Sequence, residues 1–350
     1  MPRKVDGARL EKFCTTALER AGVAPVQAAA AAGLMRLNDE LGISTHGSFH
    51  LVTYVRKMRN GSIKAGVEPA VSSEGPAWAL LDARDGLGFI ASRRAMEIAI
   101  EKARKFGLAY VGVYNSSHFG SCAAHTLQAV DSGLAAFACT NTFQLMAVPG
   151  SRGKVIGNSP FGYAFPAGRH KAVFLDVATS TAALSKVFRA AENGEMVPDG
   201  WIVDQKGRPT NDPASPGFSL APFGGHKGYG IAVGIEILSG VLAGGGFLSG
   251  VHEWFDDIAQ RNNCCHAFVA FDVEAIAGPG RFTARLERMI DEIHNEPKAE
   301  GAERIYLPGE IELDNRTRAQ AEGLELLDPH LKRLTELGRM LDLPVEEIFL

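Results

Sequence analysis

The chain contains 350 residues, of which 46% are hydrophobic and 22% are charged, and its formal net charge is −4. This composition is typical of a soluble globular protein, and the length is enough for one large domain or two medium ones. The net negative charge argues against nucleic acid or an anionic membrane as the main partner, because both require a basic surface.

The cysteines and the apolar segments indicate the cellular compartment of the protein. There are five cysteines: Cys14, Cys122, Cys139, Cys264 and Cys265. Their odd number and the lack of a C-x-x-C pair predict reduced thiols in a cytoplasmic protein. The N-terminus has no apolar core, so we expect no signal peptide. Residues 230–247 are apolar, but Glu236 and three glycines interrupt them, which predicts a buried helix and not a membrane span.

The first sixty residues are predicted to be helical throughout. Apolar residues recur at helical spacing, Gly22 ends the first helix and Gly42 ends the second. Ser44 or Thr45 can cap a third helix, which runs to the break at Gly61.

From residue 78 onward, strand patterns alternate with helical ones. Strand patterns lie at 78–82, 108–114, 134–140, 172–177, 200–204 and 266–272, and helical patterns at 92–106, 121–132, 181–191, 228–243 and 281–294. This alternation predicts an α/β core. The spacing is too irregular for an eightfold barrel, and no internal repeat is found. An extended segment at 303–313 then leads into charged helices, which we expect to pack against the first three.

The stretch N-S-S-H-F-G at 115–120 ends one predicted strand and precedes a helix. Open α/β sheets bind ligands at the carboxyl ends of their strands. The imidazole of His118 titrates near neutrality, so it can both donate and accept a proton. A lone histidine after a strand is also often a structural residue with a satisfied hydrogen bond, and the local sequence leaves both roles open.

Residues 86–91 match the dinucleotide-binding pattern G-x-G-x-x-A. A Rossmann fingerprint also needs an acidic residue at the end of a strand about twenty positions later, to hold the ribose. That position falls in Glu101-Lys102-Ala103-Arg104, inside a predicted helix. We therefore interpret 86–91 as a glycine turn.

A metal site is an alternative use of the histidines. His46 and His50 are four residues apart, a spacing that can place two imidazoles on one metal, with His118 or His125 as a third ligand. Residue 47 is glycine, so the H-E-x-x-H signature is not present. Cys264-Cys265-His266 begins a buried strand, where neighbouring side chains point to opposite faces, and it is better explained as core.

Two further loops have the chemistry of a nucleotide site. Residues 223–230 (F-G-G-H-K-G-Y-G) combine four glycines, a lysine and a helix start, so that free backbone N–H groups and Lys227 could hold a pyrophosphate. An ordinary glycine-rich turn with an exposed lysine is the other interpretation. Asp176 stands at the end of a strand and could bind a ribose hydroxyl or cap a helix.

Several motifs together resemble one known family. They are S-T-H-G at 44–47, N-S-S-H-F-G at 115–120, G-N-S-P at 157–160, D-V-A-T-S at 176–180, G-H-K-G-Y-G at 225–230 and L-P-G-E at 307–310. Their order resembles the malate/L-lactate dehydrogenase family, which also holds sulfolactate, ureidoglycolate and diketogulonate dehydrogenases and a cyclic imino-acid reductase. The resemblance spans about residues 5–345 and is distinct from Rossmann-type lactate dehydrogenases.

The resemblance implies an NAD(P)-dependent oxidoreductase with a non-Rossmann, mixed-sheet α/β cofactor domain and a helical domain built from both chain termini. We place these at 76–280 and at 1–75 plus 281–350. It also implies a homodimer that acts on a small carboxylate. Position by position, His46 and His118 match the proton-transfer residues, while Ser44 and His50 are expected at the substrate. The implied cofactor contacts are Thr142, Asp176, Val177, Ala178, Thr179, Ser180, His226, Lys227, Gly309 and Glu310.

One position departs from the family pattern. Many members carry arginine where this chain has His50, and a guanidinium can hold a substrate carboxylate through two hydrogen bonds.

The expected reaction is hydride transfer between nicotinamide and a 2-hydroxy or 2-oxo acid of the malate, lactate or sulfolactate type, with reduction of a cyclic imino acid as the alternative. A histidine-ligated metal-dependent hydrolase and a cofactor-binding protein without catalysis stay open. The sequence does not distinguish NAD from NADP.

Overall fold

The computed structural model describes residues 3–255 and 257–349. The main helices are α1 (Gly7–Arg20), α2 (Pro25–Glu40), α3 (Leu51–Asn60), α4 (Gly88–Phe106), α5 (Cys122–Asp131), α6 (Leu184–Asn193), α7 (His226–Glu236), α8 (Val273–Ala277), α9 (Arg281–His294), α10 (Glu310–Glu322) and α11 (Asp328–Leu341). Shorter helical turns are η1 (Ser44–His46), η2 (Ser48–His50), η3 (Ile237–Val241), η4 (Leu248–Gly250) and η5 (Val345–Ile348).

A seven-stranded mixed sheet forms the centre of the molecule, in the order β2-β3-β4-β11-β5-β6-β7. Its strands are β2 (Ala70–Gly75), β3 (Trp78–Asp82), β4 (Leu108–Ser116), β5 (Ala135–Thr140), β6 (Phe161–Phe165), β7 (Val173–Val177) and β11 (Cys264–Phe271). β3 and β4 are parallel and every other neighbouring pair is antiparallel. It follows that β3, β4, β5 and β7 run in one direction and end at the same edge of the sheet.

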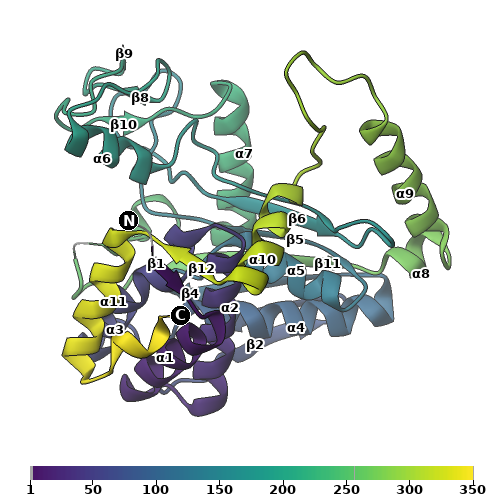
Figure 1. The fold of residues 1–350 in the computed structure, drawn as a ribbon, viewed down its shortest axis with the longest axis horizontal. Coiled ribbons are helices and arrows are strands. Elements are labelled where there is room, and N and C mark those ends of the chain that lie inside the picture. The colour runs from purple at the N-terminus through teal and green to yellow at the C-terminus, as the bar shows by residue number, and fades with distance from the viewer. Residues whose placement is uncertain (1–2, 256, 350) are drawn as a thin grey trace.

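Helices cover both faces of this sheet (Figure 1). Apolar side chains of α4 pack with one face of β3, β4, β5 and β11, including Phe268. On the other face, Ile235 of α7 packs against Cys139 and Ala267. Neighbouring residues of β11, Ala267 and Phe268, thus contribute to opposite layers, as the alternation of a strand requires.

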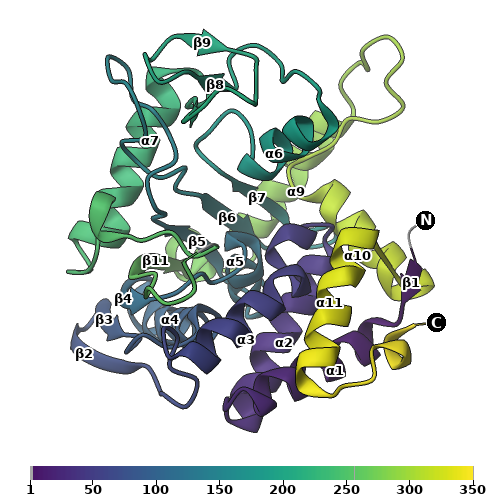
Figure 2. The ribbon, with the colours of Figure 1, turned by 90° about the vertical axis from the view of Figure 1, so that its left-hand side faces the viewer.

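The two chain ends build a helical unit beside the sheet, where Figure 2 shows α1, α2 and α3 next to α10 and α11. One continuous core joins residues 5–63 to residues 324–348 and also includes Phe89 and Trp254. A short sheet pairs β1 (Arg3–Val5) with β12 (Leu324–Leu326) in antiparallel register. The expected packing of the last helices on the first three is therefore present, although the opening of the chain is not entirely helical.

A smaller unit lies above the sheet in both views (Figures 1 and 2). It contains α6 and the sheet β10-β8-β9, made of β8 (Ile202–Val203), β9 (Pro209–Thr210) and β10 (Ser219–Leu220). Its core joins Met146, Val187, Ile202 and Leu220 to Ala232 of α7. The first turns of α7 are therefore held between this unit and the large sheet.

Two expectations from the sequence need correction, and some strands were missed. The segment predicted as extended at 303–313 turns into α10 at Glu310, because Gly309 adopts φ 90 and begins the helix. β6 was not predicted. The apolar segment 230–247 is not a buried helix, since Ile237, Val241 and Leu242 are each more than half exposed. No helix in the described ranges is long and apolar enough to cross a membrane.

Phe268 tests the sheet core. Its ring is fully buried between α4 and the strands. Replacing it with alanine should lower the free energy of unfolding by about 3–5 kcal/mol, because a cavity remains where the ring was. Phe106, which is 56% exposed, is the matched control, and its alanine variant should change stability by about 0.5 kcal/mol or less. Urea unfolding of both variants measures the difference, and equal losses would contradict this account of the core.

Candidate active site

Two consecutive 3₁₀ turns, η1 and η2, carry His46 and His50. The sequence predicted an α-helix capped at residue 44 or 45, and this prediction is wrong, because α3 begins only at Leu51. Gly47, between the turns, has non-helical backbone angles of φ −94 and ψ −138. His46 and His50 therefore lie on separate turns and not on one face of a helix. Ser44, at the start of η1, is half-buried and makes no capping bond.

His118 completes a cluster of three imidazoles. It follows the end of β4, and its ring centre lies 5.5 Å from that of His46 and 6.1 Å from that of His50. The turns η1 and η2 belong to the helical unit, whereas β4 belongs to the large sheet. The cluster thus sits where these two parts of the molecule meet, and it brings together His46, His50 and His118, whereas His125, the other possible third ligand, bonds the Phe119 carbonyl at 2.9 Å.

His118 is held by two hydrogen bonds to Nδ1 and by stacking on an indole. The hydroxyl of Tyr54 lies 2.6 Å from Nδ1 of His118, and the backbone N–H of Gly120 donates to the same atom over 3.4 Å. A backbone N–H can only donate, so we assign Nδ1 as the acceptor and place the proton of the neutral ring on Nε2. The indole of Trp254 stacks on the imidazole at 4.4 Å.

Burial keeps these imidazoles neutral. It lowers the pKa of His46 to about 4, even though part of this side chain reaches solvent. Burial also holds the pKa values of His50 and His118 well below their ordinary range, and the neighbouring rings add to the effect. Desolvation penalises the charged form of a base. No carboxylate within the described ranges contributes to the pKa shifts of these three rings, so none of them offsets that penalty.

Asp39 fixes the turns that carry the histidines. Its Oδ2 accepts hydrogen bonds from the backbone N–H of Ser48 at 3.0 Å and from the Ser48 hydroxyl at 2.7 Å. Nε2 of His330, on α11, lies 2.7 Å from the same hydroxyl. A Cβ atom at Gly47 would overlap the Asp39 carboxylate, so this close approach requires glycine. The turns are thereby tied to both α2 and α11.

The histidines do not form a recognisable metal centre. Across residues 3–255 and 257–349, no group of three or more His, Cys, Asp or Glu side chains is arranged to hold a metal ion. Nδ1 of His118 is taken by Tyr54, and His266 bonds Thr140 at 2.7 Å and Ser116 at 2.8 Å through its two ring nitrogens. Cys264, Cys265 and His266 are all buried, as expected for core residues.

The loops predicted to hold a cofactor converge at the same sheet edge. Oγ1 of Thr142 donates to Oδ1 of Asn158 at 3.1 Å, and the N–H of Thr179 donates to the carbonyl of Asn158 at 3.0 Å. The N–H of Phe223 in turn donates to the carbonyl of Thr179 at 3.0 Å. The hydroxyls of Ser159 and Thr179 are buried without a hydrogen-bond partner. Such unsatisfied groups are expected where a polar ligand supplies the missing partner.

Within residues 176–180, the side chains have different surroundings. Oδ2 of Asp176 accepts from the backbone N–H of Ala123 at 2.8 Å, so this carboxylate caps α5, and burial raises its pKa to about 6. Val177 pairs with Phe161 in the sheet, and Ala178 follows it, half-buried. The hydroxyl of Ser180 donates to the carbonyl of Ala182 at 2.7 Å. Of the two roles considered for Asp176, the structure displays the helix cap.

The helix α7 presents its N-terminus beside these loops. Gly224 and Gly225 precede it with φ 56 and 62, angles that favour glycine, and His226 and Lys227 in the first turn are exposed. No hydrogen bond ties the Lys227 side chain to any described residue, so its charge is available to a ligand. The N–H groups of Lys227 and Gly228 already donate to the carbonyls of Gly224 at 3.4 Å and Phe223 at 2.9 Å. The N–H of His226 and the Lys227 ammonium are the groups in this turn suited to a phosphate.

Gly309 and Glu310 lie at the N-terminus of α10, against β7. A Cβ atom at Gly309 would overlap the ring of Phe174, which explains the glycine. The carboxylate of Glu310 bonds Arg304 at 2.9 Å and accepts from the Leu307 N–H at 2.9 Å. Its side chain therefore already has protein partners.

The G-x-G-x-x-A segment lies at the start of α4. The hydroxyl of Ser117 accepts from the N–H of Gly88 at 2.9 Å and donates to the carbonyl of Gly86 at 3.0 Å. A Cβ atom at Gly88 would overlap the backbone carbonyl of Ser117. These glycines thus allow close packing against the loop that carries His118.

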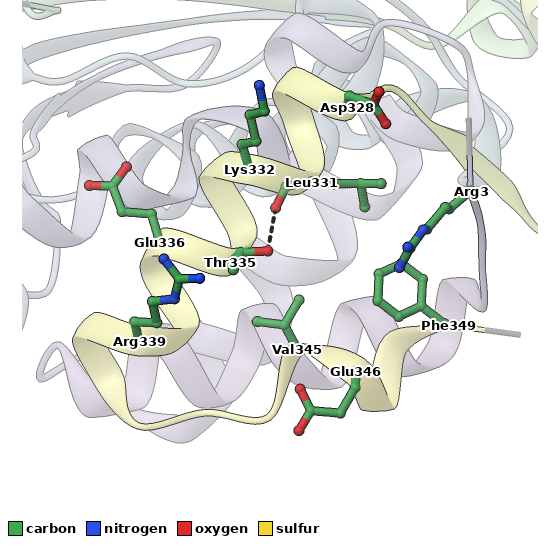
Figure 3. A pocket seen from close by; sticks show the side chains of 10 residues that line it. All are labelled: Arg3, Asp328, Leu331, Lys332, Thr335, Glu336, Arg339, Val345, Glu346 and Phe349. Carbon is green, nitrogen blue, oxygen red and sulfur yellow. Dashed lines mark hydrogen bonds between the residues drawn. The ribbon is translucent and has the colours of Figure 1, made fainter. Parts of the chain in front are cut away.

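A surface cavity of about 480 Å³ lies elsewhere, on the helical unit. Figure 3 shows it between α11 and the two chain ends, with Arg3 next to the ring of Phe349. Its charged side chains are of both signs, such as Asp328 and Lys332. None of the residues predicted for the site lines it.

Sequence reasoning missed Tyr54, Trp254 and Asp39. Tyr54 could have been found, because it lies four residues after His50, at the start of a helical pattern. Trp254 belongs to a loop with no pattern of its own. Its approach to His118 depends on the tertiary structure alone.

These observations define an α/β protein with a mixed sheet, a histidine cluster between two units and a phosphate-type loop at the same sheet edge. The family profile "Malate/L-lactate dehydrogenase" matches residues 5–335. The chain therefore belongs to the malate/L-lactate dehydrogenase family, as the motifs predicted, and it is an oxidoreductase of the dehydrogenase or reductase type.

Individual relatives agree with this assignment. The malate dehydrogenase of Pyrococcus abyssi is 33% identical over 342 residues, which cover 94% of this chain and 92% of the relative. A Δ1-pyrroline-2-carboxylate/Δ1-piperideine-2-carboxylate reductase of Pseudomonas putida is 30% identical over 298 residues, with 85% of each chain covered. The structure of the sulfolactate dehydrogenase of Methanocaldococcus jannaschii has a TM-score of 0.92 and 31% identity, covering 99% of both chains.

Asp39 makes stability depend on pH in an unusual direction. Burial raises its pKa from the ordinary 3.8 to about 7, so the folded state holds this proton more tightly than the unfolded chain. The carboxyl therefore destabilises the fold progressively as pH rises from about 4 to about 7. Asp39→Asn should reduce the loss of unfolding free energy between pH 5 and pH 8, measured by urea unfolding. The exposed Asp131→Asn is the control, and an identical pH dependence in both variants would contradict the assignment.

Proposed function

We propose that the chain transfers a hydride between a nicotinamide dinucleotide and a small 2-hydroxy or 2-oxo acid, with His118 or His46 as the acid/base. The proposal is supported most directly by the 5.5 Å separation of these imidazoles at the edge where the predicted cofactor loops converge. The dehydrogenases among the relatives carry names of malate and sulfolactate enzymes, which act on 2-hydroxy acids by those names and support hydride transfer at such a carbon.

His118 has the stronger geometry for proton transfer. With Nδ1 engaged by Tyr54, Nε2 holds the proton and is the atom to meet the substrate. During reduction, the ring takes up one proton from solvent and passes the Nε2 proton to the substrate oxygen or nitrogen, so it ends neutral with Tyr54 still bonded to Nδ1. Burial raises the pKa of Tyr54 well above its ordinary value, so this hydroxyl keeps its own proton and orients the ring. Neutral imidazoles act as electrophilic proton donors in other enzymes.

His46 is the second candidate. The Thr45 hydroxyl lies 3.0 Å from its Nδ1, so its ring is also oriented by a local hydrogen bond. We assign one histidine to the proton and the other to orienting the substrate, with Ser44 and His50 completing the substrate side. Proton donation from a positioned side chain typically contributes about 10²–10⁴-fold to rate.

The nicotinamide cofactor fits the residues at the sheet edge. Its C4 atom supplies or accepts the hydride. We propose that Lys227 and His226, with the backbone N–H of His226 at the start of α7, bind the phosphates, and that Thr142 with residues 176–180 lies along the nucleotide. The unpaired hydroxyls of Ser159 and Thr179 support a polar ligand at this position. Gly309 and Glu310 would contribute through the start of α10, on the far side of β7. NAD and NADP are both compatible with these groups.

Reduction of a cyclic imino acid is the alternative function. It is supported by the reductase relative, which shares 30% identity over 85% of the chain. The same histidine would then protonate nitrogen in place of oxygen. A metal-dependent hydrolase has less support, since Nδ1 of His118 already has a protein partner.

We also propose a cytoplasmic homodimer with two units, residues 1–75 plus 281–350 and residues 76–280, with β2 at the end of the first range pairing with the sheet of the second unit. All five cysteines are unpaired and buried, as a reducing compartment would allow. Ile237, Val241 and Leu242 expose more than half of their surface along α7 and η3. An apolar face of this kind is suited to a second copy of the chain.

Lys227 tests the cofactor site. Titration of the full chain with NADH and NADPH, followed by nicotinamide fluorescence, should show binding of at least one of them. Lys227→Ala should weaken that binding about 10-fold or more, because a charge-assisted contact to phosphate is lost. Lys206→Ala, another exposed lysine, should bind normally. If neither NADH nor NADPH binds, the proposed function is excluded.

The two histidines test the acid/base assignment. His118→Ala and His46→Ala should each lower kcat by about a hundredfold or more while leaving cofactor affinity near normal. His170→Ala provides a control, because this histidine bonds Asp291 at 3.0 Å on a surface loop. Steady-state kinetics with the best available 2-oxo acid measures the effect. Near-normal turnover in both variants would exclude the histidine mechanism.

A further inference from the structure

His50 has unusual surroundings for a polar residue. It is only 8% exposed, and its Nδ1 is buried without a hydrogen-bond partner. Three aromatic rings enclose it, with centres at 4.7 Å for Trp254, 5.0 Å for Phe49 and 5.5 Å for Phe255. A buried polar atom without a partner is costly, so this ring nitrogen is expected to meet a ligand group. The cage of Phe49, Trp254 and Phe255 surrounds that group with apolar surface.

The positive charge at this site is limited. The cation that acts on His50 is Arg333 of α11. Nε of Arg333 donates to the Phe49 carbonyl at 2.8 Å, and Nη2 donates to the Thr53 hydroxyl at 2.7 Å. The guanidinium also lies over the Phe49 ring, 4.6 Å from its centre. Burial and a second guanidinium, that of Arg56, lower the pKa of Arg333, but Arg56 is itself paired with Glu336.

The aromatic side of the cage is fixed to the rest of the site. The ammonium of Lys57 donates to the carbonyls of Asp257 at 3.0 Å and Gln260 at 2.8 Å, and the Ser62 hydroxyl donates to Ile258 at 2.6 Å. These bonds hold the loop that carries Trp254 and Phe255 against α3, the helix that begins directly after His50. The apolar surface is therefore a built part of the site.

A substrate with two anionic groups is poorly matched to these surroundings. One of its charges would be buried among aromatic rings and neutral imidazoles, with a single guanidinium nearby. Burying an unpaired charge is strongly unfavourable, whereas an apolar substituent gains from contact with the rings. A monoanion needs only one compensating positive charge.

Resting on the function proposed above, we propose that this site selects monoanionic 2-oxo acids or cyclic imino acids with an apolar substituent, and that His50 with Trp254 and Phe255 is the selecting element. His50 gives one hydrogen bond to the substrate, and the two aromatic rings pack against its apolar part. Dianions such as oxaloacetate and 3-sulfopyruvate are rejected.

The test compares kcat/KM for two groups of substrates with whichever of NADH and NADPH binds. The monoanions are 2-oxobutyrate, 4-methyl-2-oxopentanoate and Δ1-piperideine-2-carboxylate, and the dianions are oxaloacetate and 3-sulfopyruvate. The natural chain should prefer at least one monoanion about 10-fold or more over both dianions, as expected for one uncompensated charge. His50→Arg should shift the ratio about 10-fold or more toward the dianions. Trp254→Ala should lower kcat/KM more for 4-methyl-2-oxopentanoate than for 2-oxobutyrate.

His50→Asn keeps the position neutral and should retain the preference for monoanions, while His170→Arg controls for an added charge elsewhere. Circular dichroism and NADH or NADPH titration establish that each variant is folded. A natural chain that prefers either dianion, or an unchanged ratio in a folded His50→Arg variant, would overturn the inference and leave the oxidoreductase function standing. No turnover of any substrate with a bound cofactor would instead remove the proposed function, and this inference with it.

Discussion

The common direction of four strands is the constraint on which the site depends. β3, β4, β5 and β7 all end at one edge of a sheet whose neighbouring strands are mostly antiparallel. His266 on β11 joins two of these ends, because its ring nitrogens bond Ser116 and Thr140. The loop with His118 and the loop with Thr142 must therefore leave the sheet side by side. The acid/base role and the cofactor role proposed for the chain both depend on these two loops lying close together.

The helical unit supplies the other half of the site. Asp39 holds the turns that carry His46 and His50, and Lys57 holds the loop that carries Trp254. Both anchors are themselves buried polar groups with several hydrogen bonds, which makes such contacts specific in geometry. Desolvation where the two units meet keeps the imidazoles neutral. The hydrogen bond from Tyr54 to Nδ1 fixes the orientation of the His118 ring.

The surroundings of His50 combine a neutral imidazole with three aromatic rings. The nearby Arg333 guanidinium is already engaged by the Phe49 carbonyl and the Thr53 hydroxyl. Both features offer little to compensate a second substrate charge, and the apolar contacts of Trp254 and Phe255 act in the same direction. Substrate choice in this protein is therefore expected to depend on charge compensation and apolar contact together.

Much of the α/β pattern could be predicted, because strand and helix periodicity is a local property. The strand before His118, the helices α2 and α9 and the starts of the glycine-rich loops all lie close to their expected positions. The two 3₁₀ turns, β6 and the start of α10 were not predicted, since backbone angles at Gly47 and Gly309 and pairing with distant strands decide them. The exposure of Ile237, Val241 and Leu242, in and directly after η3, was not predicted either, because an apolar segment has the same composition whether it is buried or exposed.

The sequence by itself determined the residue types of the site, its family and the glycines that allow close backbone contacts, because these depend on chemistry and order along the chain. Only the tertiary structure decided that Asp176 caps α5, that Tyr54 orients His118 and that Trp254 covers it. Those contacts join segments far apart in sequence. Tertiary packing decides which residues meet there, and a local sequence pattern does not predict it.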